Sequence, residues 1–401
     1  MRRTTRSTFG LVAVLVAALA CGAPETKAPA KAPSTVPEKP ANPVELNILD
    51  VAGNLQLTQG MIDEFVAAHP DIVSKVNYTK ATAPEMPGKL LAEQRGGSSQ
   101  THLVLTGTDG LASVIEQELA LKLLPDFDSR FPKLEDNYLP AAADMQELAQ
   151  GQGITVTFYP SGPLFEYDPN IVKDPPSTTD ELLDWAKANP GKFQYAQPAN
   201  SGPGRTFLMG LPYLLGDKDP KDPVQGWDKT WDYLAELGKY VDYYPKGTTD
   251  TMKNLANGSV NMVATTTGWD INPRVLGTVP AGMKTTSLDG FHWVTDAHYA
   301  VVPRGVSEDV LSANLALIEW MLTPEQQAKA YDKGYFYPGP AVKDVTLDMA
   351  PQESQDAIEQ FGRPEYDALI EDNPQETSLP AEQQVAAFQQ WDREIGSGKT
   401  R

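Results

Sequence analysis

Short strand-like patterns alternate with helical patterns along most of this chain, and no other feature restricts its fold as strongly. Residues 44–50 alternate apolar and polar side chains like a strand, and apolar residues from Met61 to Val66 then recur at helical spacing. Further strand patterns lie at residues 102–106, 154–158, 193–196, 260–265 and 299–302. Strands that alternate with helices predict mainly parallel α/β sheets.

The chain length and the strand ends indicate where a ligand would bind. A chain of 401 residues is expected to form two domains or lobes, because single cores stop growing at about 250–300 residues. Parallel α/β sheets bind ligands beyond the carboxyl ends of their strands. Several predicted strands here end in loops rich in Gly, Thr, Ser, Asp or Trp, including residues 107–110 and 266–270.

Charge and cysteine content exclude several classes of protein. The formal net charge is −20, so the surface repels nucleic acid and anionic membranes, and we expect no nucleic-acid partner. The acidic surface favours solubility and could also attract cationic ligands. With Cys21 as its single cysteine, the chain forms no internal disulfide and no zinc site built on several cysteines.

The first residues are typical of a lipoprotein signal peptide. Three arginines precede the apolar run from Phe9 to Ala20, which is shorter than the about twenty residues that a membrane-spanning helix needs. Small residues before Cys21 resemble the bacterial lipobox, although Ala18 stands where Leu is usual. We expect residues 1–21 to be the signal peptide, with Cys21 as the lipidated first residue of the mature protein. The alternative is an ordinary signal peptide with an incidental cysteine.

Residues 22–44 predict a tether. Prolines recur there among alanines and charged residues, a composition that cannot build a core and that favours an extended, semi-rigid chain. Such a tether would hold a folded body away from a membrane.

Several motifs were tested and rejected. Residues 396–400 resemble the end of a phosphate-binding loop, but Arg393 stands in place of its first glycine and no helix follows. The signatures of serine hydrolases and zinc proteases do not occur, and only four histidines are present. Carboxylate pairs remain open as catalytic groups, because the chain carries 53 acidic residues.

Three segments carry a resemblance to a known family: residues 181–191, 296–303 and 320–327, of which the last reads Trp-Met-Leu-Thr-Pro-Glu-Gln-Gln. Together with the lipobox and the tether, they resemble the solute-binding proteins of bacterial ABC importers, over roughly residues 45–401. The body resembles the branch with iron-, thiamine- and polyamine-binding members. Within it the chain is most similar to a poorly characterised putative thiamine- or metal-type group.

The resemblance implies an α/β fold of the two-lobed, type II periplasmic-binding-protein kind, with a mainly parallel sheet flanked by helices in each lobe. Residues 45–155 and 300–401 would form lobe I, and residues 156–298 would form lobe II. The hinge would lie near residues 153–160 and 293–303. Ligand would bind between the lobes, which close over it.

Candidate ligand residues follow from these crossings and strand ends. Thr106, Thr108 and Asp109 end a strand, although Thr108 or Asp109 could instead cap a helix. Tyr159 and Ser161 lie at the first crossing, where plain turn chemistry is the alternative.

The second predicted lobe adds four more candidates. The segment from Ser201 to Arg205 opens a helix whose free N–H groups could bind an anionic group. Trp269 and Asp270 form the most pocket-like pair, because Trp could stack on a ring or cation while Asp offsets its charge. The alternative is a packed Trp beside an exposed Asp. Four other tryptophans are expected in the core: Trp185, Trp227, Trp231 and Trp320.

Asp296 and His298 complete the set, since they share one face of a regular strand. His298 could contact ligand or metal, or be a satisfied structural histidine; whether a metal takes part is unknown. Polyamine-binding members carry a Trp-x-Asp pair seven residues before the corresponding proline. Asp296 and His298 occupy those positions here, so the polyamine cage is not reproduced.

The predicted function is that of an extracytoplasmic, lipid-anchored, monomeric solute-binding protein that delivers a small solute to an ABC permease. We expect no enzymatic activity and no cofactor. The solute could be thiamine-like, a metal complex, a polyamine or a sugar. The alternatives are a surface hydrolase that uses a carboxylate pair, and a sensory or scaffolding lipoprotein with the same fold.

Overall fold

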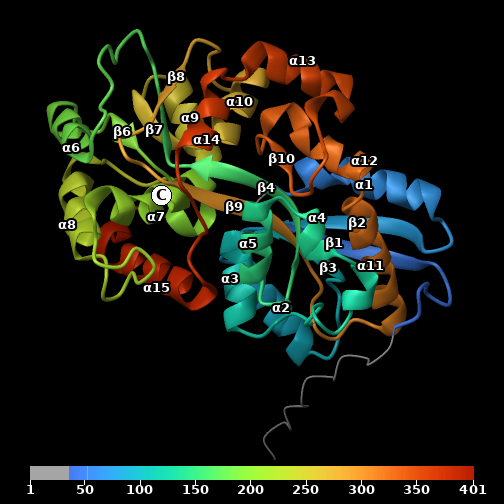
Figure 1. The fold of residues 1–401 in the computed structure, drawn as a ribbon. Coiled ribbons are helices and arrows are strands. Elements are labelled where there is room, and N and C mark those ends of the chain that lie inside the picture. Colours follow the sequence, from blue (N-terminus) through green and yellow to red (C-terminus); the bar gives the residue numbers. More distant parts are fainter. Residues whose placement is uncertain (1–35, 52) are drawn as a thin grey trace, which may run out of the picture.

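A computed structural model describes residues 36–51 and 53–401, and in this part of the chain the strands form two sheets (Figure 1). The larger sheet has the strand order β10-β4-β9-β3-β1-β2, with β11 beside β9, and the smaller sheet has the order β6-β7-β5-β8. The larger sheet is built from β1 (Val44–Val51), β2 (Val73–Ala81), β3 (Leu103–Gly107), β4 (Ile154–Gly162), β9 (Trp293–Val301), β10 (Gly339–Pro340) and β11 (Gln375–Glu376). The smaller sheet is built from β5 (Leu164–Tyr167), β6 (Phe193–Gln194), β7 (Met262–Thr265) and β8 (Lys284–Thr286).

Helices lie against both sheets, in agreement with the predicted α/β class (Figure 1). Those up to residue 188 are α1 (Leu55–Ala68), α2 (Met86–Arg95), α3 (Thr108–Glu116), α4 (Leu134–Asn137), α5 (Pro140–Leu148) and α6 (Thr179–Ala188). The next are α7 (Gly202–Leu215), α8 (Asp228–Leu237), α9 (Thr248–Ala256), α10 (Thr267–Val275) and α11 (Glu308–Met321). The last are α12 (Pro324–Gln327), α13 (Gln352–Phe361), α14 (Glu365–Asp372) and α15 (Ala381–Trp391). In the described ranges, none of these helices has both the length and the apolar character needed to cross a bilayer.

The sheets are mixed rather than mainly parallel. β1 pairs in parallel with β2 and β3, as expected for strands joined by helical crossovers. β9 instead runs antiparallel to both β3 and β4, and β5 runs antiparallel to β7. The reason is that β4 carries the chain from the larger sheet towards the smaller one and β9 brings it back, so the two strands must run in opposite directions.

β4 and β9 lie at the predicted crossings, and every residue of both strands is buried. They lie side by side from the pair Ile154–Ala300 to the pair Gly162–Val294, with a first register shift between Thr155 and Thr157 (Figure 1). The register shifts between Tyr159 and Gly162, where Ser161 has a φ of 73°. This bulge turns the chain into β5, the first strand of the smaller sheet.

The end of the chain packs on the core of the smaller sheet through Ala387, Trp391 and Ile395, although the sequence assigned residues 300–401 to lobe I. Trp391 is 1% exposed, packs edge-on against Tyr244, and donates from Nε1 to the hydroxyl of Tyr195 at 3.1 Å. Tyr366 packs in a cluster with Trp293 and Ile271. The polar, proline-interrupted sequence after residue 343 gives no periodicity that would have indicated this return.

The predicted core tryptophans divide into two groups. Trp227 and Trp231 are buried in the core of the smaller sheet, as expected, whereas Trp185 and Trp320 are half-buried at core margins. α6 begins with a capping box: the Thr178 hydroxyl accepts from the Glu181 N–H at 3.1 Å, and the Glu181 carboxylate accepts from the Ser177 N–H at 2.8 Å.

The end of the predicted tether lies against the larger sheet's helices. Val36 packs on the core, the Pro37 carbonyl accepts from the Ser312 hydroxyl at 2.7 Å, and the Ala41 N–H donates to Asp309 at 2.9 Å. Residues 36–43 therefore follow α11 before β1 begins. The predicted signal peptide, Cys21 and the tether up to residue 35 lie outside the described residues.

Candidate functional site

A cavity of about 290 Å³ lies between elements of the two sheets. This volume is at the small end of the range of about 300–1,000 Å³ for small-molecule pockets. From the larger-sheet side it is lined by Gly53, Ala81, Thr82, Gly107, Asp109, Tyr159, Asp296, His298, Tyr335 and Phe336. From the smaller-sheet side it is lined by Asn200, Ser201, Gly202, Arg205, Gly247, Thr248, Thr249 and Trp269.

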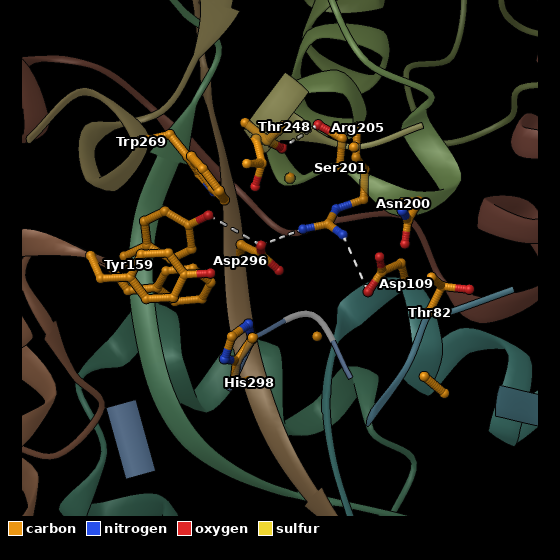
Figure 2. A pocket seen from close by; sticks show the side chains of 18 residues that line it. Thr82, Asp109, Tyr159, Asn200, Ser201, Arg205, Thr248, Trp269, Asp296 and His298 are labelled. Atoms are coloured by element: carbon orange, nitrogen blue, oxygen red, sulfur yellow. Dashed lines mark hydrogen bonds and ion pairs between the residues drawn. The ribbon is translucent and has the colours of Figure 1, made fainter. Parts of the chain in front are cut away.

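A buried arginine joins the two sides of the cavity (Figure 2). Arg205, on the first turns of α7, is 1% exposed. Its guanidinium forms an ion pair with Asp296 on β9, and its Nη1 lies 3.7 Å from Oδ1 of Asp109 on α3. Burial alone would lower the pKa of Arg205, but Asp296 and Asp109 outweigh burial and raise it. Arg205 therefore stays charged and holds both carboxylates.

Asp296 is fixed by neutral donors as well as by Arg205. Its Oδ1 accepts from the Thr108 hydroxyl at 2.7 Å and from the Ala297 N–H at 2.9 Å. Its Oδ2 accepts from the Tyr159 hydroxyl at 3.3 Å. Together with Arg205, these three donors hold the carboxylate in a fixed position.

Asp109 is held less tightly. Its Oδ1 accepts from the Gly110 N–H at 2.9 Å and faces Arg205 at the longer distance given above. Burial raises the pKa of Asp109, and the nearby Asp296 raises it further, while Arg205 only partly offsets both effects. Asp109 is thus a carboxylate whose negative charge is incompletely compensated.

His298 is neutral and has unused hydrogen-bonding capacity. It is 1% exposed, its ring lies 4.1 Å from that of Phe336, and Nδ1 has no hydrogen-bond partner among the described residues. Burial lowers the pKa of His298 to about 4, so the ring is uncharged at neutral pH.

Aromatic rings form one wall of the cavity (Figure 2). Trp269 meets the edge of Tyr335 at 5.7 Å, Tyr335 stacks on Phe336 at 5.0 Å, and Phe336 stacks on Tyr159 at 4.1 Å. This aromatic wall offers flat apolar faces and can attract a cation.

Two helix starts face the wall across the cavity. The Ser201 hydroxyl caps α7 by accepting from the Gly204 N–H at 3.1 Å, and it lies 2.8 Å from the Thr248 hydroxyl on α9. α7 can offer only the N–H of Gly202, because Pro203 has no N–H and the N–H groups of Gly204 and Arg205 donate to Ser201. The first N–H groups of α9 have no partner within the helix, so that helix start can also present donors to the cavity.

The structure brings together seven of the eleven predicted ligand residues in the cavity lining: Asp109, Tyr159, Ser201, Arg205, Trp269, Asp296 and His298. Thr108 lies behind Asp296 as a hydrogen-bond donor. Thr106 and Ser161 are fully buried, do not line the cavity, and are held by strand and bulge geometry.

Asp270 also lies away from the cavity, so the expected pair with Trp269 does not form. Consecutive helix residues point in directions about 100° apart, and Asp270 points away from the space that Trp269 borders. The fully buried Asp270 accepts from Arg274 at 2.9 Å, from Arg363 at 2.6 Å and from Tyr366 at 2.7 Å. We call these four residues the Asp270 cluster.

Sequence reasoning missed Thr82, Asn200, Thr248, Thr249, Tyr335 and Phe336. Thr248 follows a glycine and begins α9, a signal that could have been used. Tyr335 and Phe336 follow a segment with Asp332 and Lys333 at positive φ, where neither helical nor strand periodicity exists.

Glu166 lies beside the Asp270 cluster and gives a pH-dependent prediction. It is fully buried, and neither carboxylate oxygen has a hydrogen-bond partner among the described residues. Burial raises its pKa well above the usual range, and the charge of Asp270 adds to this effect.

We expect Glu166→Gln to stabilise the protein increasingly as pH rises. The pKa of Glu166 is higher in the folded state than in the unfolded state. At a pH above the unfolded pKa, the protein must therefore take up a proton when it folds, and its stability falls as the pH rises towards the folded pKa. The isosteric amide removes this loss. Thermal unfolding from pH 5 to pH 8 should show a growing advantage of the variant, and a gap that shrinks with pH would contradict the assignment.

No three His, Cys, Asp or Glu side chains converge as a metal site within residues 36–51 and 53–401.

Comparisons with known proteins agree with this architecture. The family model described as "Bacterial extracellular solute-binding protein" matches residues 60–360. No curated protein sequence matches the chain.

Solved structures share the fold at low sequence identity. A putative spermidine/putrescine ABC transporter protein from Listeria monocytogenes superposes with a TM-score of 0.60 and 16% identity, over 88% of this chain and 99% of that one. The periplasmic binding protein AfuA from Actinobacillus pleuropneumoniae, solved with fructose-6-phosphate, superposes with a TM-score of 0.62 and 16% identity, again over 88% of this chain and 99% of that one. A ferric binding protein from Campylobacter jejuni superposes with a TM-score of 0.60 and 15% identity, over 87% of this chain and 98% of that one.

These neighbours are type II periplasmic binding proteins, and the chain has their fold. Because the family model covers most of the body around the cavity, this chain belongs to the bacterial extracellular solute-binding proteins.

Proposed function

We propose that this protein captures a small solute outside the cytoplasm, in the cavity between its two sheets, and delivers it to an ABC permease. The observation that carries the proposal is the cavity itself, which is lined from both sheets and crossed by the contacts of Arg205 with Asp296 and Asp109. A ligand that touches both sides stabilises their closed arrangement by its differential affinity.

The strands β4 and β9 would act as the hinge. Both pass from one sheet to the other, and β4 carries a register shift between Tyr159 and Gly162. Bending there would open the cavity without disturbing either core. Lipidation of Cys21 and the proline-rich residues that follow would keep the protein at the membrane that holds the permease.

Ligand capture can be tested with protein purified from its native source under non-denaturing conditions. We expect mass spectrometry of the released small molecules to show one compound in a one-to-one ratio with protein. Trp269→Ala should then weaken its binding about tenfold or more in calorimetry, because the variant loses an aromatic contact in the cavity.

Trp185→Ala is the matched control. Trp185 is half-buried on α6 and does not line the cavity, so its loss should leave affinity unchanged. Equal losses in both variants would show that the cavity is not the binding site. Turnover of the captured compound would favour an enzyme instead.

A further inference from the structure

Building on the proposed function, we infer that the solute is a small organic monocation whose charge is held by Asp109 and whose body lies on the aromatic wall. This conclusion rests on the charges of the lining residues, on the wall, and on the unpartnered nitrogen of His298.

The charge balance of the cavity favours a cation. Apart from His298 and the tyrosines, its ionisable lining residues are two carboxylates, Asp109 and Asp296, and one guanidinium, Arg205. His298 is neutral, and burial raises the pKa values of Tyr159 and Tyr335 so that both stay uncharged. With both carboxylates ionised, one negative charge is left over. A buried charge without a counter-ion is unfavourable, and a monocation removes that imbalance.

The two carboxylates are not equivalent as partners. Asp296 already accepts from Thr108, Ala297 and Tyr159 and is paired with Arg205. Gly110 and Arg205 both contact Oδ1 of Asp109, so Oδ2 of Asp109 keeps acceptor capacity for a ligand. A primary ammonium or amidinium N–H donated to that oxygen would be a charge-assisted hydrogen bond, and a quaternary ammonium would be attracted by its charge alone.

The rest of the cavity defines the ligand's body. Phe336 is covered by the rings of Tyr159 and Tyr335, whereas the partly exposed Trp269 borders the cavity. The ring of Trp269 holds an alkyl-substituted or planar cation better than a strongly hydrated one. Nδ1 of His298 is buried without a partner, so a ligand hydroxyl, amide or carbonyl group near it would complete its hydrogen bonding. The volume of about 290 Å³ limits the ligand to a compact molecule.

The starts of α7 and α9 would by themselves suit an anion. An anion placed there would share the small cavity with Asp109 and Asp296, which already form ion pairs with the guanidinium of Arg205. Nε of Arg205 has no hydrogen-bond partner among the described residues and could donate to a neutral ligand oxygen. The free N–H groups serve equally well as donors to a neutral oxygen of the ligand.

Matched compounds of different charge and nearly equal shape test the inference. The first set is choline, the neutral 3,3-dimethylbutan-1-ol and the anion 3,3-dimethylbutyrate; the second is methylguanidinium, methylurea and acetate. We expect at least one of the cations to bind in calorimetry at low ionic strength, and each binding cation to bind at least about tenfold more tightly than its neutral and anionic counterparts.

Asp109→Asn should abolish this preference, because it keeps the shape of the side chain and removes its charge. Cation affinity in the unmodified protein should also fall as pH falls. Burial raises the pKa of Asp109, a bound cation would lower it, and protonation therefore competes with binding. Arg205 and Asp296 are the charged groups that face Asp109.

The inference is overturned if neither cation binds, or if a neutral or anionic compound binds more tightly than its matched cation. These comparisons use the unmodified protein and do not depend on the folding of any variant. Binding of an anion or a neutral compound in the cavity would leave the proposed function standing. If no ligand co-purifies with the protein and none of the six compounds binds, both the inference and the proposed function are contradicted.

Discussion

Replacing Arg205 by methionine should lower the free energy of unfolding by about 3–5 kcal/mol, because it leaves two buried carboxylates without their shared counter-ion. Arg205 is 1% exposed, and its partners Asp109 and Asp296 are 7% and 2% exposed, so solvent compensates poorly for the lost guanidinium. The loss should be largest at neutral pH and smaller in acid, where protonation relieves the unpaired charge. Chemical denaturation at pH 5 and pH 7.5 measures both effects.

The same substitution at Arg130 is the control. Arg130 pairs with Glu319 at 2.6 Å, but their side chains are 15% and 35% exposed, so solvent compensates for the lost pair. We expect a loss of about 1 kcal/mol or less there. If Arg205→Met costs no more than Arg130→Met, Arg205 is not the electrostatic centre of the cavity.

Asp270→Asn is the second substitution with a large expected effect, and it should act on stability rather than on ligand affinity. Asp270 is the common acceptor for Arg274, Arg363 and Tyr366, and removing its charge leaves the buried guanidinium of Arg274 and the partly exposed one of Arg363 without their carboxylate. We expect a loss of about 3–5 kcal/mol. Because Asp270 does not line the cavity, affinity for the captured ligand should stay within about twofold at temperatures where the variant is folded.

Asp250→Asn provides the comparison for this effect. Asp250 pairs with Lys253 at 3.3 Å on the surface of α9, where both side chains are more than half exposed, and its loss should be nearly neutral. If Asp270→Asn has normal stability but binds ligand poorly, this prediction is wrong and Asp270 is a ligand residue.

The predictable part of the fold came from patterns that depend on local sequence. The strand expected at residues 154–158 is part of β4, and the strand expected at residues 260–265 contains β7. The mixed sheet direction and the return of residues 381–401 to the smaller sheet depend on contacts between distant segments. No local periodicity encodes the packing of Trp391 on Tyr195 and Tyr244.

The candidate site was predictable to the extent that it lies at strand ends and helix starts. Asp109 follows β3, Ser201 caps α7, and Asp296 and His298 share a face of β9. Burial and pairing could not be inferred from these positions. The chain order does not reveal that Arg205 reaches two carboxylates from other elements, nor that Asp270 turns to Arg363 instead of the cavity.

The packing of residues 36–43 along α11 determines where the predicted tether would join the folded body. These residues join β1 at its amino end, whereas Gly53, just beyond the carboxyl end of β1, borders the cavity. A strand of this length spans roughly 25 Å. A lipid on Cys21 would therefore pull on the end of the molecule remote from the mouth of the cavity. With its attachment point at that end, the protein would be free to rotate and to turn the opening of the cavity towards solute or towards a permease.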